Sequence, residues 1–454
     1  MDILSLVQFS HAMVAIVLAT HFKFLVATAL IATAVCFFIK AKPVYLIDFM
    51  CYRPPDTTRV PISAFIEYNE RLGKFSEESI DFQTRVIERS GIGNETYLPT
   101  GFLLFPNNQT LNSAMDEVEM VLFSVVQNFF QKHKINPRTI DILITNCSVV
   151  SPTPSLASMI INKFGFRSNV MSFNLSGMGC SAGILSISLA QDLLKVHKNS
   201  WALILSMESI CSNAYHGKVK SMLLANCLFK MGGAAVLLSN RKRDRKTAKY
   251  ELKHLVRTHI GANDGFYNCV VQEQDDEGFT GVSLSRSIQQ VAGEALKTNI
   301  RILAVLVLPY SEQIKYGLSV LWKKIYPPAR KNGSEVPDFR KAFEHFCIHA
   351  GGKSVIEMIK EKLKLKDEDV EASKMTLHRF GNTSSSSTWY SLSYLEAKGR
   401  VKKRDRIWQL AFGSGFKCAS AVWKCISEIN PRSSNAWSDR IHQYPVEVPD
   451  VIDH

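Results

Sequence analysis

The hydrophobic pattern opens with one long apolar stretch. Residues 4–39 are almost wholly apolar, with a polar break at 21–23. About 20 helical residues cross the hydrocarbon core of a bilayer, so the stretch predicts a membrane anchor over residues 1–42, made of one or two helices. Lys40, Lys42 and Arg53 follow the anchor. Because cytosolic flanks of membrane segments are rich in Lys and Arg, the rest of the chain is predicted to face the cytosol.

After residue 43, short apolar runs alternate with segments of helical periodicity. The apolar runs predict strands at 43–55, 140–147, 201–206, 234–239, 252–260, 346–349 and 410–412. The helical spacing predicts helices at 75–90, 113–133, 156–164, 181–197, 288–296 and 354–365. Most of these strands are apolar on both faces, which is typical of a sheet covered by helices on both sides. The alternation therefore predicts an α/β fold.

The same pattern divides the chain after the anchor. A basic polar segment at 241–250 is the predicted linker between a first half at 43–240 and a second half at 251–430. Residues 431–454 form the predicted C-terminal tail. The second half repeats the alternation of the first, which allows a structural duplication, although no sequence repeat is visible.

Composition and charge narrow the classes of function. The chain has 454 residues, of which 46% are hydrophobic and 21% charged, and its net charge is +13. These values exclude a disordered or coiled-coil protein as the main description. The positive charge suits an anionic membrane face or phosphorylated ligands. Nucleic acid is not an expected partner, because the sequence contains no recognisable nucleic-acid-binding module.

The ten cysteines are scattered, without the close pairs of a zinc site or the spacing of a disulfide framework. Reduced thiols in a cytosolic domain are the simplest interpretation. Six N-x-S/T sequons are present, at Asn94, Asn108, Asn146, Asn174, Asn332 and Asn382. We predict that none carries a glycan, because glycosylation acts on the other side of the membrane.

Cys180 is the strongest candidate for chemistry. It lies in NLSGMGCSAG, among small residues and directly before a long apolar helix. A helix N-terminus favours negative charge, so we expect the pKa of this thiol to lie below the free value of about 8.5. The local context alone leaves a buried structural cysteine equally open.

His349 and Asn382 extend the candidate site. His349 ends an apolar strand in HFCIHAGG, at the carboxyl edge where α/β proteins place ligands. Asn382 lies in the small-residue turn LHRFGNTSSSSTWY. A Cys–His–Asn set is compatible with a papain-like protease, in which Asn orients His. It is equally compatible with a condensing enzyme, in which His and Asn hold a thioester oxyanion.

The chain resembles the plant 3-ketoacyl-CoA synthases, the condensing enzymes of very-long-chain fatty-acid elongation. The resemblance covers nearly everything after residue 43, through PVYLIDFMCYRPP, LLANCLFKMGGAAVLLSN, RTHIGAND, GVSLSRSIQQVAGEALKTNI and WQLAFGSGFKCASAVWK as well as the three motifs above. It implies a thiolase-like duplicated αβαβα core behind the membrane anchor. It also implies a decarboxylative Claisen condensation of malonyl-CoA with a long-chain acyl-CoA, giving a very-long-chain 3-oxoacyl-CoA, CO₂ and CoA.

The resemblance assigns roles to individual residues. Cys180 is implied as the acyl-accepting nucleophile, while His349 and Asn382 are implied to bind the malonyl thioester. The family's site is also drawn with histidines that match His259, His345 and His378. For these three, a structural role remains as open as a catalytic one.

The resemblance implies no metal or organic cofactor, because both CoA thioesters are substrates. It further implies the endoplasmic reticulum membrane, a homodimer, and the elongase reductases and dehydratase as neighbours. Two other functions stay open. A type III polyketide synthase uses the same three residues in a soluble enzyme, and a catalytically silent scaffold of the elongase complex would keep them without turnover.

Overall fold

The computed structural model describes residues 20, 21, 24, 28, 43–103, 110–325 and 336–448. The chain divides into two compact units, Met1–Pro43 and Val44–His454. Nearly all of the predicted anchor, residues 1–42, lies outside the described residues. Within the described ranges, no helix combines the length and the apolar character needed to cross a membrane.

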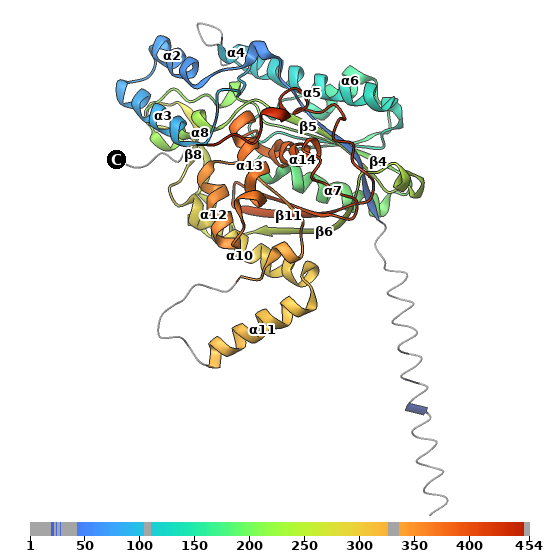
Figure 1. The fold of residues 1–454 in the computed structure, drawn as a ribbon. Helices are drawn as coiled ribbons and strands as arrows, with labels where there is room; N and C mark the ends of the chain where they lie inside the picture. Colours follow the sequence, from blue (N-terminus) through green and yellow to red (C-terminus); the bar gives the residue numbers. More distant parts are fainter. Residues whose placement is uncertain are drawn as a thin grey trace, which may run out of the picture. The chain divides into compact units, whose positions relative to one another are not determined.

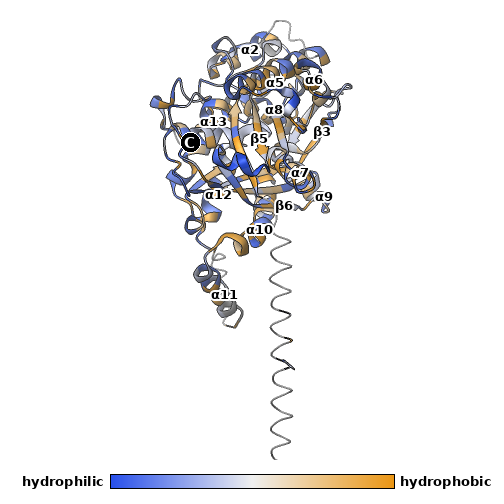
Figure 2. Cartoon of the chain, turned by 90° about the vertical axis from the view of Figure 1, so that its right-hand side faces the viewer, coloured by the Kyte–Doolittle hydropathy of each residue, from blue (hydrophilic) through white to orange (hydrophobic). Residues whose placement is uncertain are grey.

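A mixed sheet forms the centre of the unit Val44–His454 and confirms the predicted α/β class. In the described residues it has nine strands, in the order β3-β2-β4-β5-β1-β6-β11-β10-β9. The strands are β1 (Val44–Cys51), β2 (Ile142–Asn146), β3 (Met171–Leu175), β4 (Trp201–Met207), β5 (Gly233–Ser239), β6 (Tyr250–His259), β9 (His345–Ile348), β10 (Arg406–Gly413) and β11 (Lys417–Cys425). The strands predicted from apolar runs all belong to this sheet, and strands such as β5 are hydrophobic along their length (Figure 2).

The strand pairing shows the duplication that the sequence only allowed. β1 runs antiparallel to β5, β5 antiparallel to β4, and β4 parallel to β2. In the same way β6 runs antiparallel to β11, β11 antiparallel to β10, and β10 parallel to β9. The two copies meet where β1 pairs antiparallel with β6. The exact domain boundaries at 240, 250 and 430 stay predictions.

Helices form layers outside and between the two copies. They are α2 (Ile62–Leu72), α3 (Glu77–Arg89), α4 (Thr100–Leu103), α5 (Leu111–His133), α6 (Leu156–Phe164), α7 (Ala182–Val196), α8 (Lys220–Leu228), α9 (Asp264–Tyr267), α10 (Ile288–Val307), α11 (Tyr310–Ile325), α12 (Lys353–Leu363), α13 (Asp367–Phe380) and α14 (Ser387–Ala397). α5 packs on β1, β4 and β5, whereas α10 packs on β6 and β11. α7 and α14 each contact strands of both copies, so they form the central layer (Figure 1).

The helices of the central layer are deeply buried. Every residue from Ser387 to Glu396 in α14 is buried. The chain enters α7 and α14 through short 3-10 turns, Gly179–Ser181 and Ser384–Ser386, and these two turns touch. The first turn carries Cys180. The duplication therefore brings two segments about 200 residues apart in sequence to one point.

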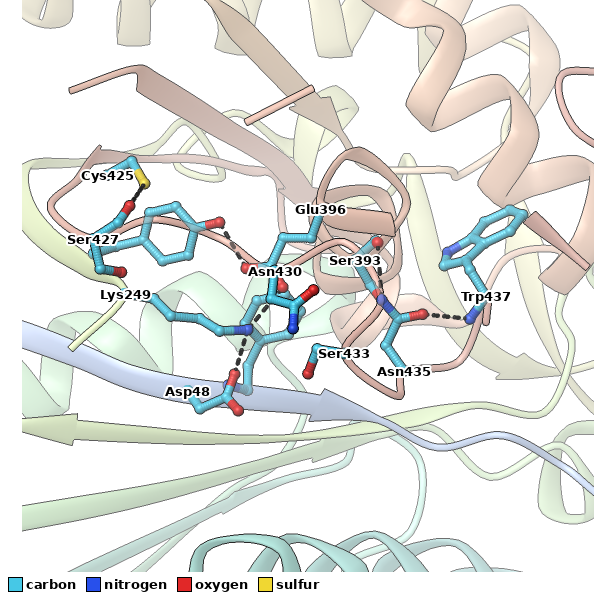
Figure 3. A network of polar contacts seen from close by, with 12 residues as sticks. Asp48, Lys249, Ser393, Glu396, Cys425, Ser427, Asn430, Ser433, Asn435 and Trp437 are labelled. Carbon is cyan, nitrogen blue, oxygen red and sulfur yellow. Dashed lines mark hydrogen bonds and ion pairs between the residues drawn. The ribbon is translucent and has the colours of Figure 1, made fainter. Parts of the chain in front are cut away.

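A buried polar network joins the two copies where β1 meets β6. Lys249 Nζ lies 2.7 Å from Asp48 Oδ1 and 2.8 Å from Glu396 Oε2 (Figure 3). The Tyr250 hydroxyl donates to Glu396 Oε1 over 2.7 Å. Because a buried charge needs a partner of opposite sign, this network ties β1, β6 and α14 together in one arrangement.

Several segments differ from the sequence predictions. The linker at 241–250 is not an open loop, since Lys242–Lys246 form a 3-10 turn and β6 begins at Tyr250. The helix predicted at 288–296 is twenty residues long as α10. A separate two-stranded sheet, β7 (Val270–Gln274) with β8 (Thr280–Leu284), was not predicted because VVQEQ and TGVSL contain no continuous apolar run.

Candidate active site

Cys180 lies in the tight turn that leads from β3 into α7. Gly179 has φ +65°, and a Cβ there would stand 2.4 Å from the backbone nitrogen of Ser414. A Cβ on Gly183 would stand 2.3 Å from the carbonyl oxygen of Ser385. Only glycine fits such approaches, so the small residues around Cys180 let two other turns close over it. The thiol is half-buried, and Ser384 Oγ donates to its Sγ over 3.4 Å.

The expected low pKa of Cys180 is wrong. Burial raises the pKa of the thiol to about 12, and the negative charge of Glu208 adds to this rise. The hydrogen bond from Ser384 works in the opposite direction but is weaker. The loss of hydration on burial thus raises the pKa of Cys180 by more than the helix N-terminus lowers it. The resting nucleophile is a thiol that needs a base.

His349 follows directly after β9 and is 4% exposed. Its backbone N–H donates to the carbonyl of Leu410, and its Nδ1 lies 2.6 Å from Ser387 Oγ. Burial lowers the pKa of the imidazole to about 4, so the ring is neutral near pH 7. A neutral ring held at Nδ1 leaves Nε2 for chemistry.

Asn382 lies just after α13, on a chain segment fixed at both backbone groups. Its N–H donates to the carbonyl of Leu228, and its own carbonyl accepts from the N–H of Lys230, both over 3.0 Å. The side-chain Oδ1 accepts from the Ser384 N–H over 2.9 Å. Nδ2 donates to the Gly351 carbonyl over 3.3 Å, a long bond that leaves this amide able to donate elsewhere.

One cavity brings these three residues together. It has a volume of about 560 Å³, and Cys180, His349 and Asn382 all line it. The segment Gly413–Gly415 also lines it. Much of the remaining wall is apolar and includes Phe229, Val270, Val282, Leu284, Ile288 and Phe412. A nucleophile and two donors in a cavity with many apolar wall residues can handle a polar reacting group on a long hydrocarbon chain.

Glu208 is a functional candidate that sequence reasoning missed. It is 4% exposed, directly follows β4 and lines the cavity. Its carboxylate accepts from the backbone N–H groups of Ser148 and Val149, and Ser384 Oγ lies 3.3 Å from Oε2. Burial raises its pKa. A charged residue immediately after a buried strand, at the carboxyl edge of a sheet, was the available signal.

Ser384 connects Glu208 with the nucleophile. It has φ +52°, a conformation that residues other than glycine adopt only under constraint. The constraint comes from its neighbours, since Asn382 Oδ1 holds its N–H and Ser385 Oγ donates to Asn146 Oδ1 over 2.7 Å. Strain of this kind concentrates at functional sites. Here it aims the Ser384 hydroxyl at Cys180.

Comparison with known proteins decides the family. The model of the FAE1/Type III polyketide synthase-like proteins matches residues 36–325, and that of the 3-oxoacyl-[acyl-carrier-protein] synthase III C terminal matches residues 340–425. 3-Ketoacyl-CoA synthase 7 of Arabidopsis thaliana is 54% identical, over 94% of this chain and 93% of the relative. The chain belongs to the 3-ketoacyl-CoA synthase family.

Other relatives and solved structures agree. 3-Ketoacyl-CoA synthase 5 of Arabidopsis thaliana is also 54% identical, over 92% of this chain and 85% of the relative. The fold is shared with the type III polyketide synthase domain of Steely1 from Dictyostelium, at a TM-score of 0.66 and 18% identity over 85% of this chain and 100% of that one. 1,3,6,8-Tetrahydroxynaphthalene synthase from Streptomyces coelicolor gives a TM-score of 0.65 at 18% identity, over 84% and 99% of the two chains.

The three remaining candidate histidines of this 3-ketoacyl-CoA synthase, His259, His345 and His378, lie in different places. His259 ends β6 and lines the cavity, where its Nδ1 accepts from the Gly261 N–H over 3.2 Å. His345 stands at the opposite end of β9 from His349, and its Nε2 is 2.9 Å from Asp405 Oδ2. Positions four apart in a strand lie on the same face, but each residue of a strand adds about 3.3 Å along it. His345 and His349 are therefore too far apart along the strand to act together. His345 is not among the residues that line the cavity.

His378 also lies outside the cavity lining. A Cβ on Gly93 would stand 2.3 Å from its ring, and the ring meets Tyr444 edge-on with centroids 6.0 Å apart. Burial lowers its pKa. Packing against Gly93 and the C-terminal segment favours a structural role for His378 over the catalytic alternative.

Proposed function

We propose that this 3-ketoacyl-CoA synthase condenses malonyl-CoA with a long-chain acyl-CoA, releasing CO₂ and CoA and forming a 3-oxoacyl-CoA two carbons longer. The observation that carries the proposal is the shared cavity, in which Cys180, His349 and Asn382 meet an apolar wall. The family membership supports the same reaction.

The first half-reaction loads the acyl chain on Cys180. Because the thiol is protonated at rest, attack on the acyl-CoA carbonyl requires a base, and the neutral imidazole of His349 fills that role. The S–C bond forms, the bond to the CoA sulfur breaks, and the imidazolium returns its proton to the leaving CoA thiolate. The Ser384 hydroxyl stabilises negative charge on Sγ through its hydrogen bond.

The second half-reaction extends the chain. The C–C bond to the malonyl carboxylate breaks, CO₂ leaves, and the electron pair forms an enolate on the thioester. Nδ2–H of Asn382 and Nε2–H of His349 donate to the enolate oxygen, each worth about 3 kcal/mol. The enolate carbon attacks the acyl thioester, the new C–C bond forms as the C–S bond to Cys180 breaks, and the Cys180 thiolate takes a proton from solvent. No metal, flavin or nicotinamide takes part in these steps.

The two half-reactions use the two neutral tautomers of His349. As a base for the thiol, Nε2 is unprotonated and Nδ1–H donates to the Ser387 oxygen, which lies 2.6 Å away. As a donor to the enolate, Nε2 carries the proton and Nδ1 accepts from the same hydroxyl, so the ring exchanges a proton with solvent between the two half-reactions. Ser387 is therefore proposed as a positioning residue. Its position at the start of the buried helix α14 fixes the ring from behind.

Membrane attachment, location and partners belong to the same proposal. The apolar stretch 4–39 supports a membrane anchor, and the basic residues after it support a catalytic unit in the cytosol. The endoplasmic reticulum is proposed as the membrane from the family resemblance. The sequons at Asn146 and Asn382 are buried in the fold, which agrees with unglycosylated sites. A glycosidase-induced mobility shift of the native protein would contradict this orientation. A homodimer and neighbouring elongase reductases and dehydratase are proposed from the family resemblance.

The test is incorporation of labelled malonyl-CoA by yeast microsomes that carry the full chain, with the products identified by mass spectrometry. We expect an elongated 3-oxoacyl product from the wild type and none from Cys180→Ala. Cys347→Ala is the matched control, because Cys347 is a buried cysteine outside the cavity lining. Equal incorporation by wild type and Cys180→Ala would contradict the proposal. A cyclised polyketide would indicate the type III synthase alternative, and absence of turnover a scaffold.

A further inference from the structure

In the described part of the chain, exposed apolar side chains gather between Ile302 and Ile325. Of fourteen large hydrophobic residues that are exposed in the described part of the molecule, eight lie between Ile302 and Ile325. They occupy the end of α10 and the whole of α11. We call the following six the apolar face: Val305, Leu306, Tyr310, Ile314, Leu318 and Trp322.

The apolar face follows the helical repeat. Tyr310, Ile314 and Leu318 are spaced by four residues, so they form one stripe along α11. Their exposed fractions are between 61% and 83%, values typical of surface side chains. In an ordinary amphipathic helix such a stripe covers the protein core. In α11 the stripe is turned outward.

Polar side chains, and not the stripe, attach α11 to the rest of the unit. Glu312 is buried and forms an ion pair with Lys341. Gln313 Nε2 donates to the carbonyls of Val305 and Leu308, over 3.3 and 2.9 Å. These contacts hold the first turn of α11 at the end of α10, and Figure 1 shows α11 beyond α10, away from the sheet. Because polar side chains of α11 contact the protein while its apolar stripe is exposed, the stripe is suited to contact an apolar medium.

The charge around the apolar face favours a lipid surface with negative headgroups. Residues 300–325 contain four basic residues and one acidic residue. The acidic residue is Glu312, which the ion pair with Lys341 neutralises, whereas Arg301 and Lys315 are exposed. Helices that lie in a membrane interface combine an apolar face with Lys and Arg, and Trp and Tyr favour the headgroup level.

The length of α11 fits a helix that lies on a bilayer. Sixteen residues give a helix about 24 Å long. Neither α11 nor α10 is long and apolar enough to cross a membrane. A stripe of this length can enter the boundary between headgroups and acyl chains with its polar side still in water.

The helix α10 links this surface to the cavity. Ile288 and Ala292, in its first two turns, line the cavity that contains Cys180. Its last turns carry Val305 and Leu306 of the apolar face. One continuous helix therefore forms part of the acyl-binding wall at one end and part of the apolar face at the other.

We infer that the apolar face of α10 and α11 is a membrane-docking surface that lies in the interface of a bilayer containing anionic phospholipids. The proposed role of this docking is to deliver a long acyl chain from the lipid to the cavity, and this role rests on the proposed condensation. The docking itself does not depend on that reaction. It is also separate from the predicted anchor at residues 1–42, which attaches the chain without specifying which face of the catalytic unit meets the lipid.

Tryptophan quenching by brominated lipids tests the inference with the full chain. The sequence has six tryptophans. Trp322 is 65% exposed on the apolar face, while Trp389, Trp408, Trp423 and Trp437 are buried. The chain is reconstituted in phosphatidylcholine–phosphatidylserine vesicles with bromine on the acyl chains. We expect quenching in the wild type and its loss in Trp322→Phe.

A second variant guards against a local effect of the indole. Ile314→Asp combined with Leu318→Asp should reduce the quenching of Trp322, because two carboxylates on the stripe oppose burial in lipid. Leu111→Asp combined with Val196→Asp is the matched control, since both residues are exposed apolar side chains outside the apolar face. The control should be quenched as strongly as the wild type.

Several outcomes would overturn the inference. They are absence of lipid-dependent quenching, quenching that persists in Trp322→Phe, and protection of the apolar face that depends on protein concentration instead of lipid, which would indicate a second copy. Equal quenching in vesicles of phosphatidylcholine alone would overturn the anionic specificity. Because no substrate is added, Cys180→Ala should be quenched like the wild type, and a failure here is distinct from a failure of the condensation.

Discussion

The protonation of His349 leads to a quantitative prediction about pH and stability. In the folded protein burial lowers the pKa of this imidazole to about 4, from a reference of 6.5. Between about pH 6.5 and pH 4, the His349 imidazole is therefore protonated in the unfolded chain but neutral in the folded chain. A group whose pKa is depressed on folding contributes stability above its unfolded pKa, and this contribution is lost as the pH falls.

The size of the effect follows from the two pKa values. At pH 7.5 the imidazole is neutral in both states and its protonation does not affect the free energy of unfolding. At pH 5.0 the unfolded state is stabilised by about 1.5 pKa units, or about 2 kcal/mol, while the folded state remains almost wholly neutral. The wild type should lose this amount between pH 7.5 and 5.0 in addition to the losses from all other groups.

The perturbation is His349→Asn, with His349→Gln as a second neutral replacement. Both variants lack the titrating ring, so the gap in free energy of unfolding between wild type and variant should change by about 2 kcal/mol between pH 7.5 and 5.0, in favour of the variants at low pH. Using the gap cancels the other titrating groups. The two replacements should agree with each other even if their absolute stabilities differ.

Urea unfolding of the detergent-solubilised full chain is a suitable assay. The buried residues Trp389, Trp408, Trp423 and Trp437 provide the fluorescence change. Parallel pH dependence of wild type and both variants would refute the reasoning, because it would mean that the ring is charged, or that water reaches it, in the folded state. The role of His349 as a neutral base would then need revision.

Four further predictions concern Ser384 and Glu208 at the site and the buried carboxyl group of Glu117. Ser384→Ala removes the donor to Cys180 and should slow iodoacetamide alkylation of that thiol about 10-fold or more at fixed pH, since a hydrogen bond to a charged group is worth about 1.5–3 kcal/mol. Ser384→Gly should slow the alkylation of Cys180 by the same factor. It should unfold at a higher urea concentration than Ser384→Ala, because glycine adopts φ +52° without strain. Equal unfolding midpoints of the two variants would contradict the strain argument. Glu208→Gln should act in the opposite direction and speed alkylation, because the carboxylate charge raises the pKa of Cys180; a slower rate would show that its hydrogen bonds matter more than its charge. Burial raises the pKa of Glu117 from 4.5 to about 7, so the folded protein loses stability as the pH rises through this range. In the same unfolding assay, the difference in free energy of unfolding between wild type and Glu117→Gln should move by about 2 kcal/mol in favour of the variant from pH 5.5 to 8. A difference that stays constant would contradict this prediction.

Much of the fold could be predicted from local pattern. The helix at Leu111–His133 and the strands at Ile142–Asn146 and Gly233–Ser239 were found within two residues of their ends, because strong apolar periodicity and tertiary burial select the same residues. Strand β3 and helices α13 and α14 were not predicted. Their sequences are mixed or serine-rich, and α14 is helical because its surroundings bury it on every side.

The positions of the candidate site residues had the same local origin. Cys180, His349 and Asn382 each lie at the end of a regular element, where short motifs are informative, and all three line one cavity. Glu208 shares this position directly after a strand and was missed, whereas the aiming of Ser384 could not be predicted in this way. Ser384 meets Cys180 across 204 positions of sequence, and only the packing of the duplicated halves brings them together.

The sequence by itself determined the fold class, the elements with clear periodicity and the three principal residues, because each depends on the order of neighbouring side chains. The tertiary structure decided what surrounds them. A helix N-terminus in sequence predicts a thiolate at Cys180, yet burial in the cavity raises its pKa to about 12. The amphipathic pattern at 310–325 predicts a helix with one apolar face, but it does not tell whether that face is turned toward the protein or away from it. Hydration and burial depend on every atom nearby, and those atoms come from segments that the linear sequence keeps far apart.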